Sequence, residues 1–164
     1  MIIPIGTRML LFRFNNYKNY AFIDEHTRII KHSGYVWLMK AGRRTNTDKL
    51  RAVLDDGGYL VLKAPIKAGG DYYLCRFEDL KENEPDDFDH VPSYYHELID
   101  VIDYSEKSCQ FFKVTWIIPL PADQVDSLIL QSKEKQVAEI IKETRTAVMF
   151  IKNTRPIEIN QGGD

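Results

Sequence analysis

The segment from residue 35 to residue 44 combines aromatic rings with positive charges. Strand alternation would place three side chains on one face, those of Tyr35, Trp37 and Met39. The cations that follow, just before a predicted helix N-terminus, are Lys40, Arg43 and Arg44. Aromatic faces stack bases, and arginine side chains and helix N-termini bind phosphate, so the segment suggests a nucleic-acid site. The residues alone favour the alternative, in which the rings belong to the core and the arginines to a solvated corner.

A second cluster combines carboxylates with imidazoles. Its members are Asp86, Asp87, Asp89, His90, His96 and Glu97. Side chains of these types can together hold a divalent ion. Their spacing matches no defined metal motif, so a solvated acidic loop is the favoured interpretation, and we predict no metal and no cofactor.

No sequence motif indicates a reaction. The sequence contains no Walker loop, no G-x-S-x-G, no H-E-x-x-H and no C-x-x-C. A nucleophile could be proposed at Ser33, beside His32, or at Cys75, but neither has a recognisable activating context. Cys75 and Cys109 both lie in apolar runs, which is typical of buried thiols. We therefore expect a non-enzymatic protein.

Length and charge limit the choice of partner. A chain of 164 residues fits one domain, and we predict a single domain over residues 1–164. The net charge of −2 means that any grip on nucleic acid must come from a local cationic patch. The first residues do not read as a signal peptide, and the sequence has no run of about 18 apolar residues. We expect a cytoplasmic protein without a membrane partner.

The pattern of apolar residues and turn formers predicts an α+β fold with a mixed, curved sheet. An N-terminal hairpin is expected within residues 1–34, with strands at 9–14 and 21–30. Residues 35–40 are nearly all apolar, which indicates a central strand. In the strand predicted at 110–118, alternation places Phe112, Val114 and Trp116 on one face. The remaining predictions are strands at 59–64, 72–77, 147–151 and 157–159, helices at 45–56 and 93–103 and from residues 123 and 132, and a surface loop at 78–89.

Several segments together resemble the EVE domain family of the PUA-like superfamily. Residues 35–40 are similar to the opening strand of these domains, and residues 58–65 to their second core strand and pocket-edge turn. Residues 71–77, 111–120 and 144–153 follow in the family's order, so the likeness covers about residues 35–159.

The resemblance implies a PUA-like pseudobarrel with helices packed at its ends. It also implies an aromatic-lined pocket for a flipped or modified base of DNA or RNA. Carried over by position, the base-binding residues are Trp37, Lys40, Lys63, Ala64, Pro65 and Trp116. Arg43 and Arg44 are the candidate phosphate-binding residues.

Three functions follow as hypotheses. The first is a nucleic-acid-binding module that recognises a modified base. The second is a protein-interaction or scaffolding domain, because the edge of the N-terminal hairpin could pair with a second copy to form a homodimer. The third is an enzyme that acts on nucleic acid through the acidic loop around Asp86 and Asp89.

Overall fold

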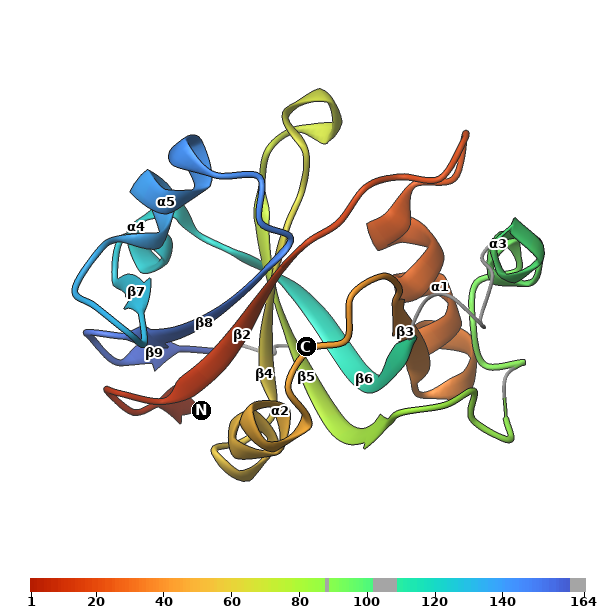
Figure 1. The fold of residues 1–164 in the computed structure, drawn as a ribbon, viewed down its shortest axis with the longest axis horizontal. Coiled ribbons are helices and arrows are strands. Elements are labelled where there is room, and N and C mark those ends of the chain that lie inside the picture. Colours follow the sequence, from red (N-terminus) through yellow and green to blue (C-terminus); the bar gives the residue numbers. More distant parts are fainter. Residues whose placement is uncertain (88, 102–108, 160–164) are drawn as a thin grey trace.

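The computed structural model describes residues 1–87, 89–101 and 109–159 (Figure 1). Within them, seven strands form one mixed sheet in the order β3-β6-β5-β4-β2-β8-β7, and β1 pairs with β9. The strands are β1 Ile2–Ile3, β2 Arg8–Arg13, β3 Val36–Lys40, β4 Tyr59–Lys63, β5 Tyr72–Lys81, β6 Gln110–Leu120, β7 Leu128–Leu130, β8 Val148–Asn153 and β9 Ile157–Glu158. The helices are α1 Phe22–Ser33, α2 Thr47–Asp55, α3 Tyr94–Val101, α4 Ala122–Val125 and α5 Val137–Glu143.

The α+β class and the mixed sheet are confirmed. Strands β2 and β4 are parallel, and the other pairs in the sheet are antiparallel. The two edges are β3 and β7, and in the described part of the chain no ladder joins them, so the sheet is not closed. In that same part no helix is long and apolar enough to cross a membrane.

The predicted N-terminal hairpin does not form, because residues 22–33 are the helix α1. Acidic residues occupy its first turn and basic residues its last turn, as the helix dipole favours. Gly34 adopts φ 89°, a left-handed conformation that suits glycine, and its N–H donates to Ile30 O at 2.7 Å. Strand β2 instead lies between β4 and β8, so it presents no free edge through which two copies could pair.

The prediction that residues 35–40 form a central strand is also wrong, because β3 lies at one edge of the sheet. All five of its residues are nevertheless buried. Val36 and Leu38 face the core cluster that contains Phe22 of α1, and Trp37 and Met39 face the cluster that contains Tyr94 and Tyr95 of α3. A strand covered on both faces is apolar throughout, whatever its position in the sheet.

Smaller corrections concern element boundaries. The predicted loop at 78–89 begins as strand, since β5 continues to Lys81. The predicted helix from residue 123 stops at Val125, and Leu128–Leu130 form β7. The helix predicted at 45–56 is present, but its N-cap is Asn46, whose side chain accepts from Lys49 N at 3.0 Å. Residues 102 and 103 of the helix predicted at 93–103 lie outside the described residues.

The core consists of three clusters of buried side chains. The first lies between one face of the sheet and helices α1 and α2, and the second lies on the opposite face beside α5, β1 and β9. The third joins β3 and β6 to α3. A register shift in β6 places Phe112 and Val114 in the first cluster and Trp116 against the second, which overturns the prediction of one shared face.

Candidate functional site

Trp37 lies in the third core cluster and is only 3% exposed. Its indole Nε1 donates to Asp87 Oδ1 at 2.9 Å, and the hydroxyl of Tyr35 donates to the other oxygen of the same carboxylate. The residues around the ring include Met39 and Phe111. Trp37 therefore does not serve as the predicted base-binding residue, because the buried ring offers no face on which a base could stack.

Trp116 does not complete an aromatic pocket with Trp37. It is half-buried against the second core cluster, and its ring centroid lies 6.5 Å from that of Tyr59. Trp37 belongs to the third cluster, so the two indoles serve separate parts of the core. The structure does not bring together the two tryptophans that the resemblance placed in one site.

The end of β4 does border a cavity. Lys63, Ala64 and Pro65 line a hollow of about 530 Å³ that also contacts Phe14, Ile66 and Ile141. Lys63 is 9% exposed, and its ammonium donates to Ala64 O and Gly70 O, both at 2.7 Å. Burial lowers the pKa of Lys63, and the positive charge of Arg13 lowers it further.

The end of β3 borders a second cavity. Lys40, Arg43 and Arg44 line this hollow of about 320 Å³. Lys40 Nζ donates to Arg43 O at 2.6 Å, and burial lowers the pKa of Lys40. Both cavities have Ala147 in their walls, so they adjoin.

Three further cations line the first cavity, and no motif in the sequence indicated them. They are Arg13, Lys142 and Arg145. Arg13 is opposite Lys63 in the parallel register of β2 and β4, because the carboxyl ends of parallel strands lie side by side. Lys142 at the end of helix α5 and Arg145 just after it were visible in the sequence, but the β2–β8 pairing is what brings this segment beside Arg13.

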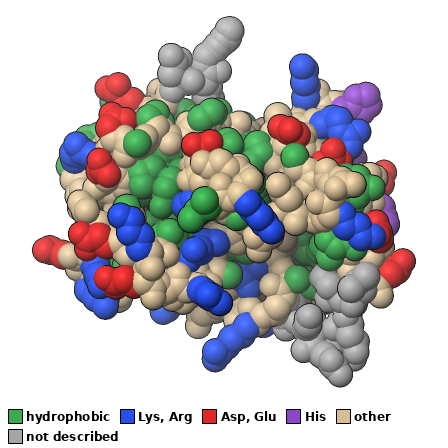
Figure 2. Space-filling view, turned by 90° about the horizontal axis from the view of Figure 1, so that it is seen from above, with side chains coloured by type: hydrophobic (Ala, Val, Ile, Leu, Met, Phe, Trp, Pro, Cys, Tyr) green, Lys and Arg blue, Asp and Glu red, His purple; other side chains and the backbone are tan. Residues whose placement is uncertain are grey.

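We call the two adjoining cavities the basic groove. Its cations are Arg13, Lys40, Arg43, Arg44, Lys63, Lys142 and Arg145. Lys and Arg side chains gather around a hollow in the lower middle of the face shown in Figure 2. No Asp or Glu is among the described residues that line either cavity. Among the ion pairs of the described residues, only Arg44 of this set is engaged, with Glu82 at 3.0 Å.

Uncompensated cations in a groove create an electrostatic site for anions. Each positive charge that lacks a carboxylate partner raises the local potential, and partly enclosed walls concentrate the field. The positive charge of Arg13 disfavours the charged form of Lys63, and the nearby carboxylate of Asp71 favours it. The groove is therefore suited to a phosphate-bearing ligand, which arginine binds through paired N–H groups.

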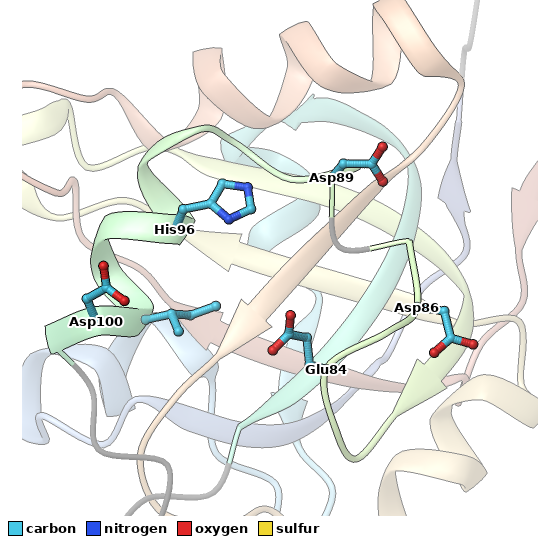
Figure 3. Close-up of a pocket in the computed structure, with 6 residues that line it drawn as sticks. Glu84, Asp86, Asp89, His96 and Asp100 are labelled. Atoms are coloured by element: carbon cyan, nitrogen blue, oxygen red, sulfur yellow. The ribbon is translucent and has the colours of Figure 1, made fainter.

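The acidic residues surround a different cavity of about 590 Å³, lined by Glu84, Asp86, Asp89, His96, Ile99 and Asp100. Figure 3 shows the carboxylates of Glu84, Asp86 and Asp89 pointing in different directions. Within the described ranges, no three His, Cys, Asp or Glu side chains are grouped closely enough to hold a metal. Asp87 and His90 contact the core instead, where the His90 ring stacks on Tyr35 at 4.4 Å.

The candidate nucleophiles differ in exposure. Cys75 is fully buried in β5, and burial raises the pKa of its thiol well above its ordinary value. A thiolate there is disfavoured, and a substrate has no access to it. Ser33 and His32 are exposed at the end of α1.

Comparisons with known proteins give no relatives, since no family model, no curated protein and no solved structure matches this chain.

Proposed function

We propose that this protein is a nucleic-acid-binding module that holds a sugar-phosphate backbone in the basic groove. The observation that carries the proposal is the gathering of seven cations around two adjoining cavities with no lining carboxylate, in a chain of net charge −2. A protein whose overall charge is slightly negative must bind phosphates through such a local patch.

The base is accommodated in the cavity beside Lys63. Its volume of about 530 Å³ lies within the ~300–1,000 Å³ that is usual for small-molecule sites. Pro65 and Ile141 supply apolar walls, and the side chain of Asn15 can exchange hydrogen bonds with a base edge. Recognition of a modified base in this cavity is part of the proposal, but apolar walls replace the indole of Trp37.

The proposal includes membership of the EVE domain family and its PUA-like pseudobarrel. Lys63, Ala64 and Pro65, which correspond to the pocket edge of that family, line the larger cavity. Three strands separate β3 from β2 in the sheet order, yet Lys40 of β3 and Phe12 of β2 line the same smaller cavity. The sheet is therefore curved enough for these two strands to border one cavity, and this curvature supports the proposal of a pseudobarrel.

The test uses two double variants with the same change in charge. Lys142→Gln with Arg145→Gln removes two exposed cations of the groove, and Lys31→Gln with Arg51→Gln removes two exposed cations outside it. Fluorescence anisotropy with labelled DNA and RNA oligonucleotides, with and without base modifications, measures affinity at several salt concentrations. The groove variant is expected to reduce the magnitude of the negative slope of log K against log salt by about one per lost phosphate contact.

The control variant is expected to bind like the parent protein. Equal affinity and equal salt slope in all three proteins would reject the groove as the binding surface. Binding of the parent that is independent of base modification would leave the phosphate site and reject the modified-base part of the proposal.

A second candidate, a protein-interaction domain, rests on a different surface. Met1, Ile2 and Ile5 are each at least 60% exposed, although all three are large and apolar. Exposed apolar residues that lie together can mark an interaction site. If this surface pairs two copies, light scattering will give a dimer that becomes a monomer in Ile2→Asp with Ile5→Asp. A parent protein that stays monomeric at high concentration rules out this pairing.

A further inference from the structure

Ile66 stands at the tip of the turn between β4 and β5 and is 90% exposed. This turn projects beyond the sheet at the top of Figure 1. A side chain this exposed contributes little burial to folding, because it contacts water in the folded and the unfolded chain alike. The apolar character of Ile66 is therefore free to serve contact with a ligand.

The turn that carries Ile66 is held firmly. A short 3-10 helix, Ile66–Ala68, is closed by bonds from Ala68 N and Gly70 N to Pro65 O at 2.9 and 3.0 Å. Gly69 and Gly70 adopt φ 102° and 71°, values that favour glycine. The Lys63 ammonium links the two arms of the hairpin through Ala64 O and Gly70 O. The isoleucine is thus presented on a preorganised support.

Ile66 also borders the basic groove. It lines the larger cavity together with Arg13, Lys63 and Arg145. A nucleic-acid strand whose phosphates contact these cations passes beside the tip of the hairpin. Apolar side chains placed in this way can enter between neighbouring bases and unstack them.

We propose that Ile66 is a wedge that enters a base step of duplex nucleic acid and frees a base for the cavity beside Lys63. The inference rests on the proposed function, because the cations of the groove must first hold the backbone. A paired base cannot reach a cavity while it remains stacked, so a module that binds bases in a duplex must open the step. The substrate class is therefore duplex DNA or RNA, with the hairpin tip inserted at the opened step.

The experiment follows base stacking and binding separately. Short DNA and RNA duplexes carry 2-aminopurine at each central position in turn, and its fluorescence rises when the base leaves the stack. Anisotropy of a separate end label reports binding. Ile66→Ala is compared with the parent protein, with Ile66→Leu, which keeps an apolar wedge, and with Ile5→Ala, a change at another exposed isoleucine, which lies outside the groove.

The parent protein, Ile66→Leu and Ile5→Ala are expected to raise 2-aminopurine fluorescence, and Ile66→Ala is not. Ile66→Ala should bind a matched duplex about ten-fold more weakly, and a duplex with a mismatch, where unstacking is easier, almost as well as the parent does. Since Ile66 is exposed, circular dichroism should show an unchanged fold.

Two outcomes overturn the wedge. Either the parent binds the duplex with no rise in 2-aminopurine fluorescence, or Ile66→Ala produces the same rise as the parent. Both leave the groove as a phosphate-binding site. Failure of the proposed function is distinguishable, because the end label then shows no binding of the parent to any oligonucleotide.

Discussion

Trp37 and Lys40 are three residues apart on the same strand, yet they serve different parts of the molecule. Trp37 packs beneath α3 with its indole bonded to Asp87, and Lys40 borders a cavity. An odd spacing on a strand places two side chains on opposite faces, so one pocket cannot use both directly. The aromatic part of this segment therefore builds the core, and the cationic part builds the groove.

The largest expected effect is a loss of stability when the aromatic ring of Trp37 is removed. Trp37→Ala should lower the free energy of unfolding by about 3–5 kcal/mol, because it leaves a cavity beneath α3. Affinity of the remaining folded protein for an oligonucleotide should not change. Urea denaturation measures the first quantity and anisotropy the second.

Trp37→Phe serves as the matched control, since it keeps an aromatic ring and loses the bond to Asp87. A smaller loss of stability than in Trp37→Ala is expected. If Trp37→Ala stayed fully stable and lost oligonucleotide binding, the assignment of this ring to the core would be wrong.

A pH effect belongs to the same core region. His26 of α1 is fully buried, with its ring bonded to Phe22 O and to the hydroxyl of Tyr95. Burial lowers the pKa of His26 from 6.5 to about 4. Between these values the unfolded chain binds a proton that the folded chain does not, so stability is complete above pH 6.5 and falls as pH decreases toward 4.

The loss attributable to His26 is on the order of 3 kcal/mol. Urea denaturation of the parent and of His26→Gln from pH 7 to pH 4 measures it. The stability of the parent should fall more steeply with acid than that of the variant. Parallel pH profiles would show that His26 does not titrate differently in the two states.

Substitutions in the basic groove should change the affinity for an oligonucleotide, whereas substitutions in the core change stability. Lys63→Met keeps the length of the side chain and removes the charge, so affinity for an oligonucleotide should fall by about ten-fold. The magnitude of the negative slope of log K against log salt should decrease by about one. Stability should fall by about 1–3 kcal/mol, because Ala64 O and Gly70 O lose their donor.

Lys63→Arg restores the charge and separates the two effects. Recovery of the salt slope in Lys63→Arg, measured by anisotropy, would assign the loss in Lys63→Met to charge. A salt slope that is identical in the parent and Lys63→Met would remove Lys63 from the phosphate contacts.

Local patterns were sufficient for part of this fold and insufficient for the site. Strand β4 and helix α2 were recognisable because their apolar spacing and glycine stop lie within a few residues. Residues 21–30 were misassigned, since aromatic and β-branched residues favour strands while the end charges of α1 favour a helix. The meeting of Arg13, Lys63 and Arg145 depends on pairing between strands far apart in the chain, which a local pattern does not specify.

The smallest expected effect is a gain in affinity for an oligonucleotide, where the other variants of the groove lose affinity. Glu82 neutralises Arg44 and also accepts from Thr47 Oγ1 at 2.5 Å and Gln110 Nε2 at 3.0 Å. Glu82→Gln removes the negative charge beside the groove and frees the guanidinium of Arg44 for phosphate. Affinity should therefore rise by about two- to three-fold, the scale of a partly exposed ion pair.

Anisotropy at low and high salt measures this gain, which should shrink at high salt because screening weakens both interactions. Asp48→Asn removes a carboxylate from the neighbouring helix α2 that pairs with none of the groove's cations, so it is the matched control. An equal gain in both variants would mean that only net charge matters. A gain confined to Glu82→Gln would assign Arg44 itself to the binding surface, while Trp37, on the other face of β3, would still contribute only to the core.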